Sequence, residues 1–191
     1  MEELLNISPV DGRYEKNTEE IRNYFSEIHL MKNRILVEIE WLKTLSTIPE
    51  IGIKLKREEQ EKLEDIIHQF DLIQGQRVKE IEATTKHDVK AVEYYINERL
   101  KELNLEKLCS FVHFACTSED INNIAYGIME QELLEKVFLP EANQLLVLLK
   151  EKAHQYSRVS MLSHTHGQNA TPTTVGKEFA NFVHRLRKNC G

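Results

Sequence analysis

The sequence predicts an all-α protein. Long segments carry apolar residues at helical spacing, and the few glycines and prolines, 7 and 4 in 191 residues, gather at the apparent boundaries between those segments. A hydrophobic fraction of 41% is enough for a packed core and too high for a disordered chain. We expect an N-terminal helical domain over residues 1–112 and the first long helices of a central helical bundle over residues 113–191.

The first predicted helix runs from about Thr18 to Leu45. It follows the segment SPVDGRY, whose proline and Asp-Gly pair are typical of a turn. Its apolar residues form one stripe with helical spacing. These residues are Ile21, Phe25, Ile28, Ile35, Ile39, Trp41, Leu42 and Leu45. After the breaking segment TIPEIG, a charged helix is expected over residues 57–70.

The next segment, residues 78–103, predicts two helices rather than one. Adjacent threonines weaken a helix, and Thr85 followed three positions later by Asp88 resembles a capping box. We therefore expect one helix to end near Thr84 and the next to begin near Lys86. The apolar face of the second helix comprises Val89, Val92, Ile96 and Leu100.

The longest predicted element extends from Ser118 to about Tyr156, with Pro140 as the point where it kinks or restarts. A helix of this length needs long partners, so we expect a bundle completed by more sequence or by other chains. Residues 160–174, SMLSHTHGQNATPTT, are expected to form an irregular connection. A final helix is predicted to open after TPTT.

Composition narrows the functional class. The 25 basic and 31 acidic residues give a formal charge of −6, which argues against a general nucleic-acid binder. Three cysteines without a C-x-x-C pair favour reduced thiols in a cytosolic protein. We see no secretory signal and no apolar run long enough for a membrane span, so a cytoplasmic location is expected.

Four polar clusters lie at predicted helix starts or connections: DGRY, TTKHD, CTSED and SHTHGQ. Each has a purely structural interpretation as a turn or an N-cap. The chemical interpretation is that helix N-termini bind anions. Thr117 and Ser118 would supply hydroxyls and amides, Lys86 and His87 would add cationic donors, and the Arg13 guanidinium suits phosphate or carboxylate. Together the clusters indicate a ligand with several negative groups.

His166 is the strongest candidate for proton transfer, because an imidazole exchanges protons near neutral pH. Gly167 leaves room for close backbone approach, and the amide of Gln168 would orient a ligand. His164 and His166 also form an H-x-H pair, which binds zinc in some proteins.

In that zinc site, His87 or Asp88 would supply the remaining ligands. Such pairs usually open on a β-strand, and little of this sequence predicts a strand. We therefore favour the general acid over a metal site.

The segments SPVDGRY, TTKHDVKAVEYY, FVHFACTSEDINN and SHTHGQNATPTTVGKEFAN, in this order and at these spacings, resemble the bacterial type of the adenylosuccinate lyase family, within the fumarase/aspartase superfamily. The resemblance covers the chain to about Arg187. It implies an all-α, three-domain protein that forms a homotetramer around a central bundle. It also implies β-elimination of fumarate from adenylosuccinate, giving AMP, and from the succinyl-carboxamide ribotide of purine synthesis. No cofactor and no metal are expected.

The resemblance implies roles for particular residues. Those around the substrate are Arg13, Tyr14, Lys86, His87, Asp88, Thr117 and Ser118. The first two would contact the nucleotide, the next three would lie near the phosphate and the leaving group, and the last two would hold the succinyl part. His166 would be the general acid that protonates the departing nitrogen, and His164 receives no role.

Two features depart from the family pattern. Asn169 replaces the proline of GQPATP, and the serine-bearing loop with MPxKxNP does not occur in these 191 residues. We therefore expect the chain to be the N-terminal part of the enzyme and to be inactive alone. Two alternatives remain open. One is a non-catalytic helical oligomerisation module, and the other is a different superfamily lyase such as argininosuccinate lyase.

Overall fold

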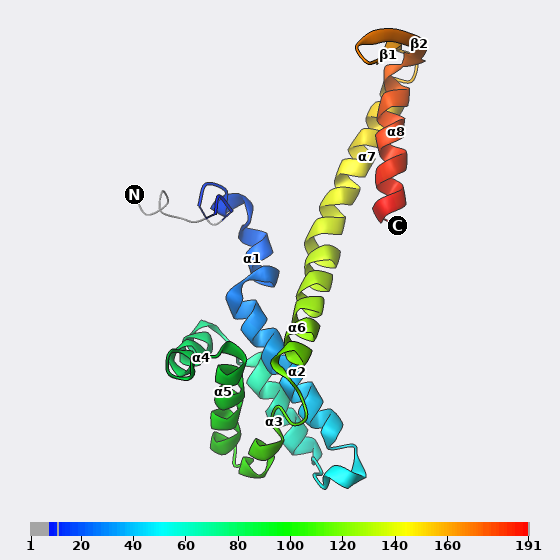
Figure 1. Cartoon of the computed structure of the whole chain (residues 1–191). Helices are drawn as coiled ribbons and strands as arrows, with labels where there is room; N and C mark the ends of the chain where they lie inside the picture. The colour runs from blue at the N-terminus through cyan, green and yellow to red at the C-terminus, as the bar shows by residue number, and fades with distance from the viewer. Residues whose placement is uncertain (1–7, 11, 191) are drawn as a thin grey trace. The chain divides into compact units, whose positions relative to one another are not determined.

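The computed structural model describes residues 8–10 and 12–190, which are mainly helical, as predicted (Figure 1). Asp11 of the SPVDGRY segment lies outside the described residues. The chain divides into two compact units, Met1–Leu133 and Leu134–Gly191. In the described ranges, no helix is both long and apolar enough to cross a membrane.

The first unit is built from six α-helices and three short 3₁₀ helices among its described residues. The α-helices are α1 (Glu19–Phe25), α2 (Glu27–Leu45), α3 (Arg57–His68), α4 (Leu72–Thr85), α5 (Asp88–Glu102) and α6 (Ser118–Leu133). The 3₁₀ helices are η2 (Glu15–Asn17), η3 (Pro49–Ile51) and η4 (Glu106–Phe111).

The core of the first unit lies among α2, α3, α4, α5 and η4. Residues of the predicted stripes meet there, because helical spacing places them on one face of each helix. Fully buried examples are Ile35, Leu42, Leu63, Ile96, Leu100 and Leu108. The predicted apolar face of α5 is confirmed, since Val89, Val92, Ile96 and Leu100 are all buried.

The single helix predicted from Thr18 to Leu45 is wrong in one respect. Ser26 adopts an extended backbone, with φ −98° and ψ 165°, and separates α1 from α2. Ile21 and Phe25, on the α1 side of the break, remain largely exposed, whereas Ile35, Ile39 and Leu42 of α2 are completely buried. The continuous stripe in the sequence therefore spans two helices with different environments.

The boundary between α4 and α5 lies close to the predicted one but has a different cap. Lys86 adopts a left-handed conformation, with φ 56°, and ends α4. His87 is the N-cap of α5, and its Nδ1 accepts a hydrogen bond from the Lys90 N–H at 3.2 Å. The predicted Thr85–Asp88 capping box is therefore replaced by an imidazole cap.

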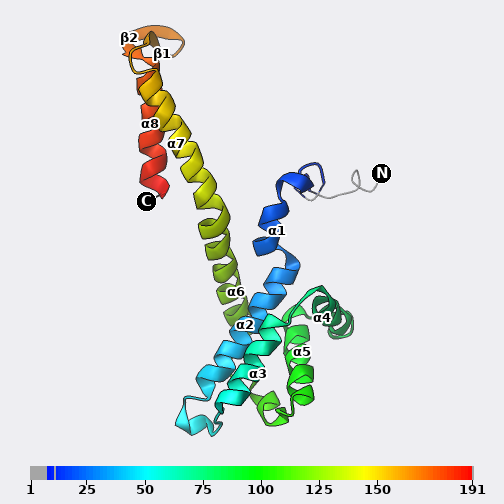
Figure 2. The same ribbon diagram turned by 180° about the vertical axis from the view of Figure 1, so that it is seen from behind.

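The second unit contains a π-helix (Leu134–Phe138), α7 (Leu139–Gln155), β1 (Ser160–Thr165), β2 (Gln168–Thr174) and α8 (Val175–Cys190). Pro140 lies in the first turn of α7, so a new helix begins there. This is one of the two outcomes predicted for Pro140, the other being a kink. Figure 2 shows α7 and α8 side by side, with the strands at their joined ends.

The irregular connection predicted at residues 160–174 is instead an antiparallel β-hairpin. The register pairs Ser160 with Thr174 and Thr165 with Gln168, with an irregularity between Leu162 and His164. The sequence obscured this hairpin because Pro172 lies within β2, and proline usually argues against a strand.

Close backbone packing joins the end of α7 to the start of α8. A Cβ on Gly176 would lie 2.4 Å from the carbonyl oxygen of Ala153 and 2.6 Å from the backbone of Ser157. The rings of Tyr156 and Phe179 stack nearby, with centroids 6.1 Å apart. Gly176 is the only described residue of this unit that is buried, so most apolar side chains of α7 and α8 remain accessible.

Candidate functional site

A pocket of about 360 Å³ in the first unit collects three of the predicted ligand-binding residues. It is lined by Lys86, His87 and Asp88 from the α4–α5 boundary, by Val78 and Glu82 of α4, and by Glu27, Leu30, Met31 and Arg34 of α2. The sharp turn at Lys86 and the cap at His87 explain why consecutive side chains reach the same cavity. The sequence therefore predicted one wall of this pocket and missed the wall formed by α2.

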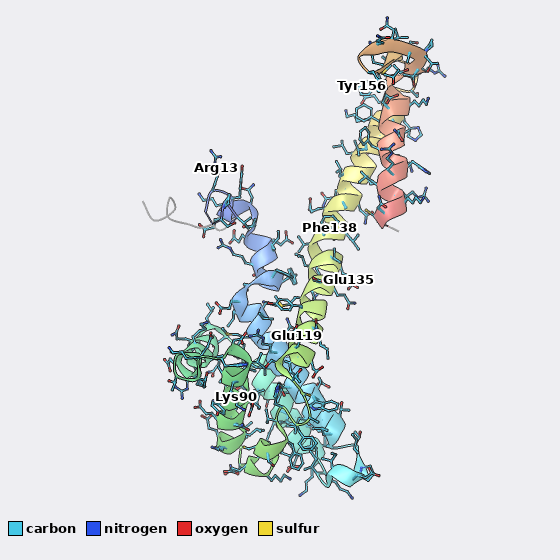
Figure 3. All side chains as sticks on the ribbon, viewed as in Figure 1. Arg13, Lys90, Glu119, Glu135, Phe138 and Tyr156 are labelled. Atoms are coloured by element: carbon cyan, nitrogen blue, oxygen red, sulfur yellow. The ribbon has the colours of Figure 1, made fainter. Side chains whose placement is uncertain are left out.

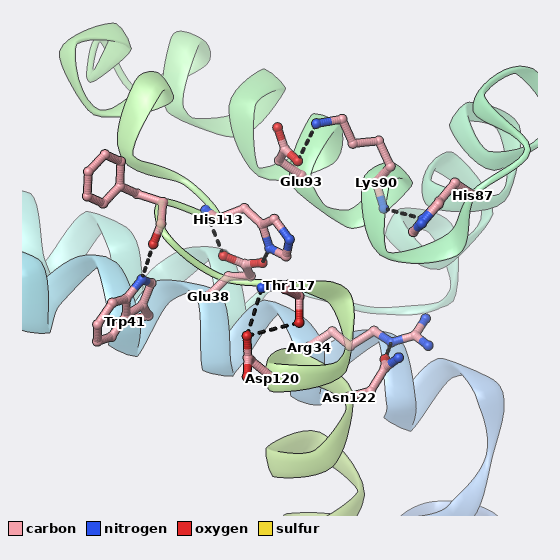
Figure 4. Close-up of polar contacts among 11 residues, drawn as sticks. Arg34, Glu38, Trp41, His87, Lys90, Glu93, His113, Thr117, Asp120 and Asn122 are labelled. Atoms are coloured by element: carbon pink, nitrogen blue, oxygen red, sulfur yellow. Dashed lines mark hydrogen bonds and ion pairs between the residues drawn. The ribbon is translucent and has the colours of Figure 1, made fainter.

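Arg34 is the most deeply bonded of the pocket residues that the sequence did not single out. Its side chain is only 6% exposed. Its Nη2 donates to Asp88 Oδ2 at 2.6 Å, and its Nε donates to Asn122 Oδ1 at 2.9 Å, the second contact being drawn in Figure 4. A signal existed in the sequence, because Arg34 lies seven and eight positions before Trp41 and Leu42 of the apolar stripe, a spacing that places it on the same helix face.

Asp88 is held as a carboxylate. Burial acts to raise its pKa, but the Val89 N–H and the Arg34 guanidinium outweigh burial, so that the pKa of Asp88 lies below its ordinary value. Its position at the start of α5 also favours a negative charge, since helix N-termini carry partial positive charge. Asp88 therefore places a fixed negative charge beside the buried cation.

His87 is half-exposed at the same helix start. Because its Nδ1 accepts the Lys90 N–H, a neutral His87 carries its proton on Nε2. The neighbouring Asp88 Oδ1 lies 3.7 Å from Nδ1. His87 thus presents an Nε2–H donor to the pocket. The neighbouring Lys86 has no ion-pair partner among the residues the structure describes.

A second buried polar contact lies one helical turn further along α2. The Glu38 side chain is 1% exposed, and its Oε1 lies 2.5 Å from Nδ1 of His113, while Oε2 accepts the His113 backbone N–H at 3.0 Å (Figure 4). Burial raises the pKa of Glu38, and the hydrogen bonds and charge of His113 oppose that rise without cancelling it. This pair fixes the loop that leads into α6.

Thr117 and Ser118 open α6, as predicted. Asp120 Oδ2 accepts both the Thr117 N–H at 2.8 Å and the Thr117 hydroxyl at 3.0 Å. These bonds lower the pKa of Asp120, the backbone bond most. The Thr117 hydroxyl is therefore engaged in a cap, whereas the half-buried Ser118 hydroxyl has no hydrogen-bond partner within residues 8–10 and 12–190.

His166 and Gln168 lie in the second unit, at the tip of the β1–β2 hairpin. His166 and Gly167 have φ of 51° and 75° and form its two-residue turn, in which positive φ at both central positions suits the strand twist. Gln168 begins β2, and His164 pairs with Asn169 across the strands. The His166 side chain is exposed and has no hydrogen-bond partner in the described part of the chain.

Arg13 and Tyr14 are exposed in the turn that precedes η2, and Arg13 is labelled in Figure 3. The Tyr14 N–H donates to the Pro9 carbonyl at 2.8 Å, which closes this turn. Neither residue lines the pocket at the α4–α5 boundary. Among the described residues, no group of three or more His, Cys, Asp or Glu side chains is arranged to hold a metal ion.

The chain is similar to known lyases in sequence. A family model described as "Lyase" matches residues 12–191. Proteins named adenylosuccinate lyase are 45% identical over 186 residues in Legionella pneumophila (strain Corby) and 43% identical over 188 residues in Haemophilus influenzae. These matches cover 95% and 97% of this chain but 41% of each relative, so the chain spans less than half of their length.

Solved structures show the same fold at low sequence identity. A fumarate lyase from Mesorhizobium sp. BNC1 matches with a TM-score of 0.71 at 14% identity, covering 90% of this chain and 38% of that one. The β-carboxy-cis,cis-muconate cycloisomerase from Acinetobacter calcoaceticus sp. ADP1 matches with a TM-score of 0.70 at 16% identity, covering 90% and 39%.

Proposed function

Because the chain belongs to this lyase family, we propose that the whole protein is an adenylosuccinate lyase of purine nucleotide biosynthesis. The observation that carries the proposal is the similarity over almost the whole chain to bacterial proteins of that name. The substrates proposed are adenylosuccinate and the succinyl-carboxamide ribotide. The products are fumarate together with AMP or the free carboxamide ribotide.

The proposed reaction is a β-elimination. A base removes a proton from the succinyl carbon next to the one that bears nitrogen, a carbon–carbon double bond forms, and the carbon–nitrogen bond breaks. The electron pair of that bond goes to the amine nitrogen, which receives a proton from a general acid. Positioned charge would stabilise the carbanion-like state between these events.

We assign substrate binding in the first unit to two helix starts. Lys86, His87 and Asp88 would lie near the phosphate and leaving group. Lys86, which has no ion-pair partner among the described residues, and the Nε2–H of His87 support this by offering donors in one pocket. Thr117 and Ser118 would hold the succinyl carboxylates. The Ser118 hydroxyl, which has no hydrogen-bond partner in the described part of the chain, supports this assignment more directly than the hydroxyl of Thr117, which caps its own helix.

Arg13 and Tyr14 would contact the nucleotide, which their exposure permits. His166 would be the general acid, with Gln168 beside it to orient the ligand. The His166 imidazole is exposed on a two-residue turn between paired strands and has no hydrogen-bond partner among the described residues, which leaves it accessible to a substrate. The base would come from the serine-bearing loop that the family pattern contains and these 191 residues lack.

The rest of the proposal concerns assembly. A homotetramer around a central bundle is supported by the accessible apolar side chains of α7 and α8. A cytoplasmic location is supported by three free cysteines. We propose that the reaction needs no cofactor.

The domain boundary proposed after residue 112 places α6 with the bundle, whereas the compact units of the structure divide after Leu133.

The test is a direct assay of the whole protein. Incubation with adenylosuccinate should release fumarate and AMP in equal amounts. The absorbance change of the purine would measure the reaction. Argininosuccinate serves as the control substrate and should give no fumarate. Turnover of argininosuccinate without turnover of adenylosuccinate would assign the protein to a different lyase of the superfamily.

A further inference from the structure

The buried face of α2 carries charged residues where apolar ones would be expected. Among the described residues, Asn33, Arg34 and Glu38 are the buried polar or charged ones, and all three lie on α2. Arg34 and Glu38 are four positions apart, so they are neighbours on the helix surface. The Arg34 side chain reaches Asn122 and the Glu38 side chain reaches His113 (Figure 4).

Arg34 joins two helix starts that are far apart in sequence. One end of its guanidinium bonds Asp88, the first residue of α5, and Nε bonds Asn122 in the second turn of α6. A guanidinium is planar and presents its donors in a rigid fork, so two simultaneous bonds set the direction of both partners. A lysine could not hold both partners in the same way.

Glu38 secures the same helix start from its other side. It bonds both the backbone and the ring of His113, which lies four residues before Thr117. Asn122, held by Arg34, lies four residues after Ser118. The start of α6 is therefore tied to α2 on both sides of the Thr117–Ser118 pair, by two side chains of one helix.

This arrangement is costly for stability alone. Removing a guanidinium from water is expensive, and the Arg34 side chain is 6% exposed while its carboxylate partner is 51% exposed. Replacing such a buried ionic group by a well-packed apolar one is often neutral or stabilising. A role in fixing geometry explains the presence of this cation better than a contribution to stability does.

The geometry points to Arg34 as a positioning residue that holds the start of α5, with His87 and Asp88, at a fixed place relative to the start of α6, with Thr117 and Ser118. Its consequence for catalysis rests on the proposed function, in which these two helix starts grip opposite parts of one substrate. Arg34 itself would act through Asp88 and Asn122.

The first experiment measures steady-state kinetics of the whole protein. Arg34→Met keeps the bulk but removes the charge and the fork, and Arg34→Lys keeps the charge only. Misplacing binding groups by about 1 Å can cost about 100-fold in rate, so we expect kcat/KM of Arg34→Met to fall by about that factor, with most of the loss in KM. Arg34→Lys should lie between Arg34→Met and the wild type.

Arg77→Met is the matched control. Arg77 is also paired with two side chains, Glu98 and Glu80, but it does not line the pocket. Its kinetic constants should equal those of the wild type. A folded Arg34→Met protein with KM and kcat within about twofold of the wild type would overturn the inference, because a merely structural arginine affects the amount of folded protein and not its KM.

The second experiment does not depend on activity. Amide hydrogen exchange, followed by mass spectrometry, should become faster in Arg34→Met over both residues 86–91 and residues 113–122, and should stay unchanged in Arg77→Met. Unchanged exchange in either segment would contradict the positioning role. A wild-type protein that releases no fumarate would refute the proposed function, while the exchange result would still decide the role of Arg34.

Should Arg34→Met not fold, Asn122→Ala provides the test. This change removes the acceptor on α6 and leaves the Arg34–Asp88 ion pair intact. We expect a raised KM and faster exchange over residues 113–122. Wild-type values for both measurements would overturn the inference.

Discussion

Two residues with a proposed chemical role, Lys86 and His166, have an unusual backbone conformation. In the described part of the chain, five residues other than glycine have positive φ, and Lys86, His113 and His166 are among them. L-residues with side chains pay a conformational cost in this region, and such residues gather at functional sites. Lys86 lines the pocket at the α4–α5 boundary, the His113 ring and backbone bond Glu38, and His166 is the proposed general acid.

The general-acid role proposed for His166 gives the first prediction. Asn tolerates positive φ but cannot transfer a proton near neutral pH, so His166→Asn in the whole protein should keep the turn and lose turnover. We expect kcat to fall by about 10² to 10⁴-fold, the usual range for a general acid. Stopped-time assays of fumarate release would measure it.

His164→Asn is the control for this prediction, because His164 is also exposed on the same hairpin. Its kcat should be close to that of the wild type. If His166→Asn also retains near-normal turnover, His166 is not the acid.

The buried Glu38 carboxyl gives a pH-dependent prediction. Burial raises the pKa of Glu38 in the folded state above its ordinary value of 4.5, so folding favours the protonated carboxyl. The stability gained in this way is fully present below pH 4.5 and is lost as the pH rises through the folded-state pKa. Glu38→Gln removes this titration. The free energy of unfolding of the wild type, measured in urea against that of the variant, should therefore decline between pH 4 and pH 8.

Taking the difference between the two proteins cancels the titration of every other group that is unaffected by the substitution. A difference that stays constant over this pH range would show that Glu38 has the same pKa in the folded and unfolded states.

At the scale of elements, the sequence predicted most helices and several of their boundaries but missed the break between α1 and α2. The predicted apolar face of α5 is confirmed, because Val89, Val92 and Ile96 are buried. Local periodicity was enough to predict this face. The break at Ser26 has no local signal such as glycine or proline, and it depends on where α1 and α2 pack. Lys86, His87 and Asp88 line one pocket and are consecutive in the sequence, whereas Arg34 joins them only through tertiary contacts.

The hairpin shows a different limit of sequence reasoning. Its strands are largely exposed, so no alternation of apolar and polar residues marks them. The available signal was the His166–Gly167 pair, because glycine at the second central position favours a two-residue hairpin turn.

Two glycines in helices should respond in opposite ways to alanine. At Gly176 the new Cβ would meet backbone atoms at 2.4–2.6 Å, so Gly176→Ala should destabilise the packing of α7 against α8 by about 1–3 kcal/mol. At Gly127 in α6 no atom lies within 4 Å, so Gly127→Ala should stabilise by about 0.5–1 kcal/mol, from helix propensity alone. Thermal unfolding followed by circular dichroism would compare the two variants, and equal shifts in one direction would contradict the prediction.

At the scale of the whole molecule, the proposed acid His166 and the pocket at the α4–α5 boundary belong to different compact units, and the serine-bearing loop of the family pattern does not occur in these 191 residues. We predict that the purified 191-residue chain releases no fumarate from adenylosuccinate above the uncatalysed rate. The whole protein at equal concentration is the positive control. Turnover by the chain at an ordinary enzymatic rate would refute this prediction and, with it, the need for the serine-bearing loop.

We also predict that the chain associates with itself through exposed apolar side chains of the second unit. Leu145, Val147, Leu148 and Phe182 are 49–57% exposed on α7 and α8. Exposed apolar surface of this kind favours contact with other chains. Sedimentation velocity of the 22.4 kDa chain should show species larger than a monomer, and the double substitution Leu145→Glu with Leu148→Glu should weaken association by about tenfold or more.

Leu72 and Ile73, an exposed pair at the start of α4, provide the control for this effect. Changing both to Glu adds the same charge to the first unit and should leave association unchanged. A monomeric chain at all concentrations, or equal effects of the two double substitutions, would contradict a specific role for α7 and α8.

The left-handed turn at Lys86 has a consequence for engineering. Glycine would fit this backbone without strain, so a library screened only for heat resistance should enrich glycine at position 86. Such a selection would discard the Lys86 amino group, which lines the pocket and has no ion-pair partner in residues 8–10 and 12–190. Thermostable versions of this protein should therefore be chosen with position 86 held fixed.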